Sequence, residues 1–428
     1  NGLKIFIVES NREPTVTFRL LVRSGSAYDG TKTGLANLAT ALLDRGTKTR
    51  SADEFARQLD FIGASFNAGA TSDATFVSAD GLTKFQDKIL DLFSDAVLHP
   101  AFPADELAKE KTKALSAIEA EKKSPGTLGA KLRKAIIFGT HPYGLSATEQ
   151  SVKAIEQADV AAFHHTYFLP NNATLAIVGD VKADQVLEQI KKAFDGWKRG
   201  PIPKTDWPKF PEQKGVTIHL IDRPGSVQSN VLVAQKGVPR NNPMVPELNV
   251  LNTALGGGSS GRLFQNLREK HGWTYGAYSS FTFQKVGGIF SAGAEVRNEV
   301  TDLAIAEIMK ELNRIRSEPM PELELALQRD YSVGNYLLSL ESPERTAERV
   351  QEIDLYNLSK DFYRNYAKRL SGVTPPQALD LAKKYISTTD AAIIVVGDAS
   401  QVKSKLEKFG KVQVYDADLH PLAPTAAK

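Results

Sequence analysis

The strongest constraint on this chain is an internal repeat, whose two copies are related along most of their length by one constant offset in residue number. Residues Leu175–Asp180 read LAIVGD, and residues Ile393–Asp398 read IIVVGD, so the offset between Asp180 and Asp398 is 218. Each segment predicts a short buried strand that ends in a Gly-Asp turn. The same offset relates four further pairs, which are Ser124-Pro125 with Ser342-Pro343, Tyr167 with Tyr385, Pro103 with Pro321, and Leu107 with Leu325. One register shared by all these positions indicates two copies of one folding unit.

The offset is smaller near the start of each copy. Thr40-Ala41-Leu42 pairs best with Thr253-Ala254-Leu255, and the offset between Thr40 and Thr253 is 213 rather than 218. A loop that differs in length between the copies would produce this change, and loops tolerate such differences.

A proline-rich segment separates the two copies. Lys198–Pro211 contains four prolines, which favour an extended and semi-rigid backbone, so we interpret this segment as a linker. The predicted division is an N-terminal domain at residues 1–205, the end of the linker at 206–214, and a C-terminal domain at 215–428.

Strand and helix patterns are mixed within each copy. Val16–Arg23 alternates like a strand, residues 34–44 and 53–63 have helical patterns, and a strand at Ala74–Ala79 precedes a helix at 84–98. This order lacks a simple βαβ alternation. It predicts an α+β fold of two tandem homologous domains, each a mostly antiparallel sheet with helices packed on one face.

Composition excludes several classes of function. The net charge is +3, from 53 basic and 50 acidic residues. This nearly even balance gives no overall positive field that would attract nucleic acid. Cysteine is absent, which excludes disulfides and Cys-based zinc sites. The sequence contains no apolar run of about 18 residues, so it predicts no membrane-spanning helix. A first residue that is not Met and the lack of cysteine lead us to expect a processed periplasmic protein, with the cytoplasm as the alternative.

Two glycine-containing segments stand out in the second copy. The run Gly256–Gly261 lacks the Gly-Lys-Ser/Thr ending of a phosphate-binding loop and follows a helical pattern, so a turn after a helix is its simplest interpretation. Gly272 predicts the end of a helix that contains Arg268. A strand predicted at Trp273–Phe283 would then place Tyr275 near Arg268 at a corner. The alternative is that Arg268 caps the helix and Tyr275 is a core residue.

An ordered set of motifs resembles the M16 (pitrilysin or insulinase type) zinc metallopeptidases, in their M16B branch. The resemblance covers nearly the whole chain. Its motifs are Gly34–Ala41, Arg45-Gly46-Thr47, Leu59–Ala64, Asn67-Ala68, His141–Gly144, Tyr167–Ala173, Val178–Asp180, Ser260–Phe264, and Leu267-Arg268 with Tyr275.

The metal motif of that family is degenerate in this chain. The family carries H-x-x-E-H on a helix, with two zinc ligands and a glutamate that activates water. Here the stretch reads Asn37-Leu38-Ala39-Thr40-Ala41. The third ligand of the family falls near Ala117 and Glu119, and a lone carboxylate would not hold zinc. We therefore expect no zinc site in this chain.

The resemblance implies a role that depends on a second subunit. Arg268 and Tyr275 resemble a pair that M16 enzymes place opposite zinc, which implies substrate binding and transition-state stabilisation at the site of a zinc-binding partner. The chain would be the non-metal subunit of a heterodimeric zinc endopeptidase, with Gly256, Gly257 and Gly258 near the peptide substrate. The alternatives are a structural scaffold subunit and a peptide-binding dimer without catalysis.

Overall fold

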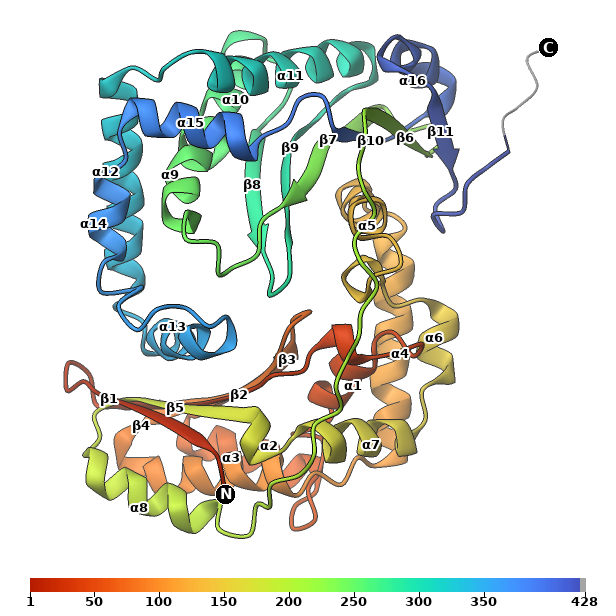
Figure 1. Cartoon of the computed structure of the whole chain (residues 1–428). Helices are drawn as coiled ribbons and strands as arrows, with labels where there is room; N and C mark the ends of the chain where they lie inside the picture. The colour runs from red at the N-terminus through yellow and green to blue at the C-terminus, as the bar shows by residue number, and fades with distance from the viewer. Residues whose placement is uncertain (424–428) are drawn as a thin grey trace. The chain divides into compact units, whose positions relative to one another are not determined.

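The computed structural model describes residues 1–423 (Figure 1). Contacts between residues divide the chain into two compact units. Unit 1 comprises Asn1–Ile118, Ser146–Trp207 and Leu338–Lys360. Unit 2 comprises Glu119–Leu145, Pro208–Leu337 and the residues from Asp361 onward. Each compact unit contains segments from both sides of the boundary predicted at 206–214, and that boundary between the repeats stays a prediction.

Unit 1 is built on a five-stranded sheet in the order β1-β5-β2-β4-β3. Its strands are β1 (Lys4–Glu9), β2 (Thr15–Val22), β3 (Ser65–Ala70), β4 (Thr75–Leu82) and β5 (Ala173–Gly179). Only the β1–β5 pair is parallel, and the other neighbours are antiparallel.

Unit 2 is built on a six-stranded sheet in the order β11-β6-β10-β7-β9-β8. Its strands are β6 (Val216–Asp222), β7 (Gln228–Gly237), β8 (Ala277–Phe283), β9 (Gly288–Arg297), β10 (Ala391–Gly397) and β11 (Val412–Tyr415). β6 is parallel to both β10 and β11, and the other neighbours are antiparallel. The prediction of an α+β fold with two mostly antiparallel sheets is confirmed.

The strand register confirms both offsets of the repeat. Lys4 of β1 is aligned with Thr174 of β5, and Thr217 of β6 is aligned with Ala392 of β10. The offset in residue number is therefore 218 between β5 and β10, from Thr174 to Ala392, but 213 between β1 and β6, from Lys4 to Thr217. The change of offset leaves the strand order intact, as expected for a difference in loop length.

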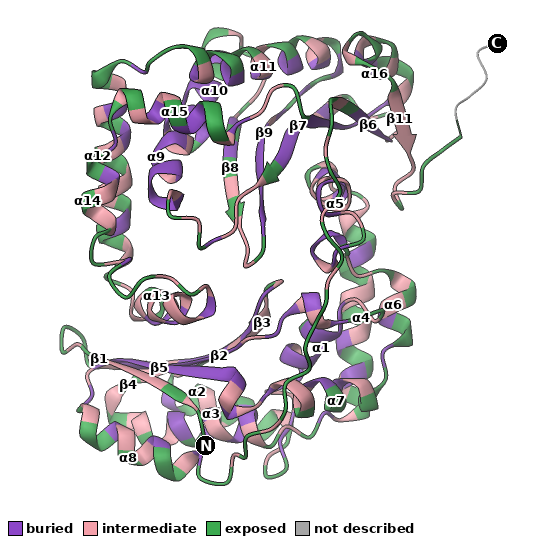
Figure 2. Ribbon diagram, viewed as in Figure 1, coloured by how far each residue is buried: buried purple, intermediate pink, exposed green. Residues whose placement is uncertain are grey.

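Helices cover one face of each sheet and build its main core (Figure 2). In unit 1 these are α1 (Leu35–Ala41), α2 (Ala52–Ile62), α3 (Gln86–Leu98), α7 (Gln157–Tyr167) and α8 (Ala183–Ala193). In unit 2 they are chiefly α9 (Val245–Gly256), α11 (Thr301–Ser317), α15 (Pro375–Tyr385) and α16 (Ala399–Leu406). Alternate residues of the central strands, such as Leu175 and Ile177, point into this core.

The opposite face of each sheet carries a helix from the other repeat. In unit 1, Ala347 of α13 (Pro343–Leu355) packs against Ala176 and Val178, which alternate with the core-facing residues of β5. In unit 2, α5 (Pro125–Phe138) packs against β7 and β10. The starts of α5 and α13, at Pro125 and Pro343, have the same offset of 218, so the two repeats exchange equivalent helices.

The repeated Ser-Pro pairs start these exchanged helices. Ser124 accepts a hydrogen bond from the N–H of Thr127, and Ser342 accepts one from the N–H of Arg345. In each case proline occupies the first helical turn, where its missing N–H costs no hydrogen bond.

The remaining helices are α4 (Ala104–Glu121), α6 (Glu149–Ala154), α10 (Arg262–Phe264), α12 (Glu322–Ser339) and α14 (Tyr366–Ser371). Among residues 1–423, no helix is long and apolar enough to cross a membrane.

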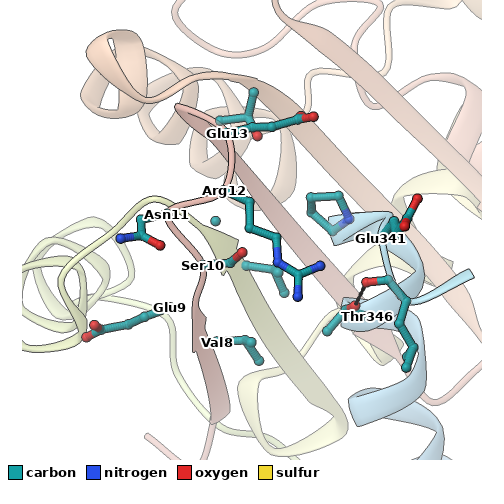
Figure 3. Close-up of a pocket in the computed structure, with 13 residues that line it drawn as sticks. Val8, Glu9, Ser10, Asn11, Arg12, Glu13, Glu341 and Thr346 are labelled. Carbon is teal, nitrogen blue, oxygen red and sulfur yellow. Dashed lines mark hydrogen bonds between the residues drawn. The ribbon is translucent and has the colours of Figure 1, made fainter. Parts of the chain in front are cut away.

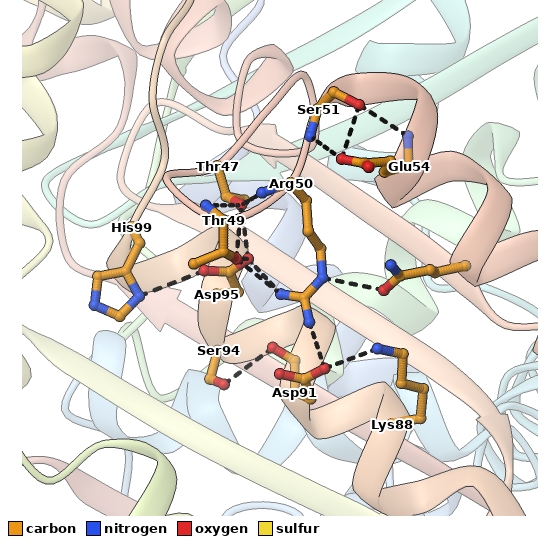
Figure 4. A network of polar contacts seen from close by, with 11 residues as sticks. Thr47, Thr49, Arg50, Ser51, Glu54, Lys88, Asp91, Ser94, Asp95 and His99 are labelled. Atoms are coloured by element: carbon orange, nitrogen blue, oxygen red, sulfur yellow. Dashed lines mark hydrogen bonds and ion pairs between the residues drawn. The ribbon is translucent and has the colours of Figure 1, made fainter.

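A buried carboxylate fastens the loop that follows α1 to α3 (Figure 4). Asp95 accepts hydrogen bonds from Thr47 at 2.6 Å, Thr49 at 2.8 Å and Arg50 at 2.5 Å. Burial alone would raise the pKa of Asp95, but these three donors outweigh it and hold that pKa below its ordinary value. The network therefore fixes the chain directly after α1.

Candidate functional site

The helix that would carry the metal motif is capped by a buried carboxylate. Asp29 accepts hydrogen bonds from the N–H groups of Gly34 at 2.7 Å and Ala36 at 2.8 Å, at the start of α1. Gly34 has a φ of 103°, which favours glycine at this position. Burial raises the pKa of Asp29 to about 6, although the backbone N–H groups oppose that shift.

The side chains at the metal-motif positions do not fit zinc. Leu38 and Ala39 are buried and apolar, and Asn37 is exposed and neutral. The Thr40 hydroxyl donates to the carbonyl groups of Ala36 and Asn37, both at 3.0 Å, so the helix backbone uses it. None of these groups matches the imidazole and carboxylate ligands of zinc peptidases.

The third predicted position gives the same result. Ala117 has no ligand atom, and Glu119 is an exposed residue 3.5 Å from the ammonium of Lys122. In the part of the chain that the structure describes, no three His, Cys, Asp or Glu residues group together in a way that could hold a metal ion.

The corner predicted in the second repeat has an identifiable backbone cause. Arg268 lies in a π-helical turn at Gln265–Lys270 that follows α10. That turn ends where the N–H of Gly272, at a φ of 64°, donates to the carbonyl of Arg268 at 2.9 Å. The predicted helix end at Gly272 is confirmed.

Tyr275 lies in the turn before the strand. The strand predicted from Trp273 begins only at Ala277, because the Thr274 hydroxyl accepts from the N–H of Gly276 at 3.1 Å and donates to its carbonyl at 2.8 Å. The Tyr275 side chain is 90% exposed. The alternative that Tyr275 is a core residue is therefore wrong.

The Arg268 side chain contacts two neighbouring residues and is also partly exposed to solvent. Its guanidinium carbon lies 4.8 Å from the ring centroid of Phe264, and its Nε lies 3.7 Å from Glu269. The side chain is 46% exposed. Within residues 1–423 no hydrogen bond joins Arg268 to Tyr275, so both side chains keep donors for another molecule.

The three predicted substrate-contacting glycines have different surroundings. A Cβ atom at Gly256 would lie 2.6 Å from the Ser279 nitrogen, and one at Gly257 would lie 2.7 Å from the Thr253 Cα. The fold itself therefore requires glycine at both positions. At Gly258 the nearest heavy atom would be the Tyr331 hydroxyl at 3.9 Å. Packing does not explain Gly258, and its contact with substrate stays a prediction.

A separate hollow in unit 1 has no evident catalytic set (Figure 3). It lies between the β1–β2 turn and the start of α13, and the Arg12 side chain points into it. Its other charged lining residues, Glu9, Glu13 and Glu341, are all acidic. No sequence pattern marks this hollow, because short turns carry no periodic signal.

The fold and the degenerate motif together define a class: a duplicated α+β chain of peptidase type without metal ligands in its first repeat. Residues 4–150 match the family described as insulinase (peptidase family M16), and residues 154–331 match the peptidase M16 inactive domain. The chain belongs to the M16 peptidase family.

Two relatives that match nearly the whole of this chain are both named as uncharacterized zinc proteases. The uncharacterized zinc protease YmxG of Bacillus subtilis is 24% identical over 94% of this chain and 98% of its own length. An uncharacterized zinc protease of Mycobacterium leprae is 26% identical over 94% of this chain and 91% of its own.

Solved structures show the same architecture. A peptidase M16 inactive domain from Pseudomonas fluorescens is 27% identical, with a TM-score of 0.86 over 93% of this chain and 96% of that one. A protease from Helicobacter pylori is 22% identical, with a TM-score of 0.87 over 92% of this chain and 97% of that one, a similarity that concerns the fold.

Proposed function

We propose that this chain is the non-metal subunit of a heterodimeric M16 zinc endopeptidase that acts in the periplasm. A homologous subunit of the M16B branch supplies the H-x-x-E-H helix and its zinc, and this chain supplies Arg268 and Tyr275. The observation that carries the proposal is a contrast between the repeats. The α1 positions hold no ligands, while Tyr275 and Arg268 are exposed with free donors.

The chemistry of the corner supports this role. A phenol O–H and a guanidinium N–H both donate hydrogen bonds, and such donors stabilise the oxyanion that forms when a peptide carbonyl is attacked. Arg268 is held against Phe264 by a cation–π contact, which limits the number of conformations that it loses on binding. The tight turn around Thr274 holds the backbone of Tyr275 in the same way.

The experiment is a reconstitution with a zinc-binding M16 subunit of similar length, followed by cleavage of an internally quenched peptide. Tyr275→Phe and Arg268→Ala should each lower kcat by about 10²-fold, the usual cost of removing an oxyanion donor. Size-exclusion chromatography should show an intact complex in both cases.

Two matched variants serve as controls. Tyr278→Phe changes another exposed tyrosine, which follows Tyr275 closely in the sequence and lies on β8. Arg297→Ala changes an arginine with similar exposure and a similar neighbour, Glu299 at 3.8 Å. Both should keep full activity. Full turnover of Tyr275→Phe and Arg268→Ala would instead favour the scaffold role.

A further inference from the structure

An apolar stripe lies on the exposed side of α12. Leu323, Leu327, Tyr331 and Leu337 are between 52 and 77% exposed. Their spacing places all four within about 120° of the helix surface. Exposed apolar side chains gathered on one helix face mark a place where another molecule binds, and the exposed carboxylate of Asp330 lies within the same arc.

The first repeat provides an internal comparison. α4 is the equivalent helix at the same offset in residue number, and its residues at the four stripe positions are all charged and exposed. They are Asp105, Lys109, Lys113 and Glu119. The two helices have the same length and the same place in the repeat, so the helix itself does not require leucine there.

Gly334 lies within the same stripe. A Cβ atom there would have no heavy atom within 4 Å, so no packing contact requires glycine at this position. Glycine inside a helix is destabilising relative to alanine. It leaves the helix backbone open to close approach by a ligand between Tyr331 and Leu337.

The stripe adjoins a loop with free backbone donors. The Ser260 hydroxyl lies 3.3 Å from the amide nitrogen of Gln328, a buried residue of α12, and Arg262 donates to Glu324 of the same helix at 2.6 Å. Within residues 1–423 the N–H groups of residues 258–260 donate no hydrogen bond. Apolar side chains and free N–H donors therefore lie next to one another.

We infer that the α12 stripe and the loop at residues 258–260 bind an extended apolar peptide segment. A bound helix would satisfy its own carbonyl groups, whereas an extended segment presents both side chains and free carbonyls. The stripe is about 21 Å long at 1.5 Å per residue, which is the length of about six extended residues. It is one helix face wide, which is small for a stable protein dimer.

This inference rests on the proposed function for the identity of the ligand as a substrate. It assigns the second repeat a binding surface for apolar residues of the peptide, in addition to the Arg268 and Tyr275 corner. Its test uses this chain alone, without the zinc-binding subunit, so its failure is distinct from failure of the proposed function.

The probe is a fluorescein-labelled heptapeptide that alternates leucine and serine, and fluorescence anisotropy measures its binding to the full chain. The test variant is Leu323→Asp/Leu327→Lys, which introduces the residues that α4 carries at the equivalent positions. We expect its Kd to rise by about tenfold or more, because two apolar contacts are lost. Leu303→Asp, at another exposed leucine on α11, should leave the Kd unchanged.

Three outcomes would overturn the inference. The first is equal binding of the heptapeptide by the wild type and the double variant, or no binding by either. The second is tighter binding of a lactam-bridged leucine-rich helical peptide than of the heptapeptide. The third is self-association of the wild type, seen by sedimentation velocity and abolished in the double variant, which would assign the stripe to a second copy. Circular dichroism and unchanged thermal unfolding establish that the variant is folded.

Discussion

Gln351 and Arg19 bind each other through two hydrogen bonds, although they come from different repeats. The Gln351 carbonyl accepts from the Arg19 guanidinium, and the Gln351 amide donates to the Arg19 backbone carbonyl at 2.8 Å. The same amide donates to the carbonyl of Thr174 at 2.9 Å. Gln351 thus fastens α13 to β2 and β5. Its equivalent in the first repeat, Arg133 of α5, donates to the hydroxyl of Ser291 in β9 at 2.7 Å.

Gln351→Ala should lower the free energy of unfolding by about 2 to 4 kcal/mol, because it leaves the buried Arg19 guanidinium without its side-chain acceptor and removes the hydrogen bonds that the amide donates to the carbonyl groups of Arg19 and Thr174. Urea denaturation followed by tryptophan fluorescence measures the change. Arg345→Ala, at an exposed position on the same helix, should change stability by less than about 0.5 kcal/mol. Equal effects of the two substitutions would contradict the role of Gln351.

Cutting the chain at the linker should leave neither half stably folded. Fragment 1–205 would lack α13 on its sheet, and fragment 215–428 would lack α5, so each would expose an apolar sheet face to water. Near-ultraviolet circular dichroism should show no native signal for either fragment alone and a native signal after co-expression. A fragment that folds cooperatively by itself would show that the exchanged helix is dispensable.

Asp29 should make the chain less stable as the pH rises. Its folded-state pKa of about 6 lies above the value of 3.8 for an exposed aspartate. The folded state therefore holds the proton more tightly, and this contribution is present below pH 4 and lost as the pH rises through 6. The free energy of unfolding of Asp29→Asn, taken relative to that of wild type, should therefore increase by about 2 to 3 kcal/mol between pH 4 and pH 8.

The pH dependence of urea denaturation for both proteins provides that comparison. Asparagine offers one acceptor where aspartate offers two, so the variant has a constant loss that does not change with pH. The diagnostic quantity is the slope of the stability difference against pH. A flat difference between pH 4 and pH 8 would mean that Asp29 does not titrate in this range.

The glycines after α9 should separate into two groups. Gly256→Ala should destabilise the chain, because the new Cβ would lie 2.6 Å from a backbone nitrogen, with an expected cost of about 1 to 3 kcal/mol. Gly258→Ala should leave thermal stability nearly unchanged, since the nearest atom is 3.9 Å away. Any loss of peptide binding by Gly258→Ala would then report on function rather than on folding. A large drop in its unfolding temperature would refute this assignment.

Local patterns in the sequence were sufficient for several features. The matched strands at Leu175 and Ile393 and the helix end at Gly272 both depend on neighbouring residues and backbone preferences. The lack of ligands at Asn37, Thr40 and Ala41 is also a matter of residue type, because no packing can turn these side chains into zinc ligands.

Tyr275 shows where local patterns were insufficient. Alternating apolar residues from Trp273 suggested a strand, but the hydroxyl of Thr274 bonds to the backbone of Gly276 and holds a turn instead. The sequence likewise did not reveal that leucines of α12 are exposed. Their helical spacing is also that of a buried face, and only the structure shows that Leu323 and Leu327 are exposed.

The sequence by itself determined that the chain is a duplicated α+β fold with no zinc ligands in its first repeat, because repeats, turns and residue chemistry are local properties. Only the tertiary structure decided that each sheet takes a helix from the other repeat. An apolar helix face indicates that the helix must be buried, but it does not indicate which sheet will bury it. The two equivalent sheets offer similar surfaces. The contacts of Gln351 with Arg19 and of Arg133 with Ser291 show which choice the folded chain makes.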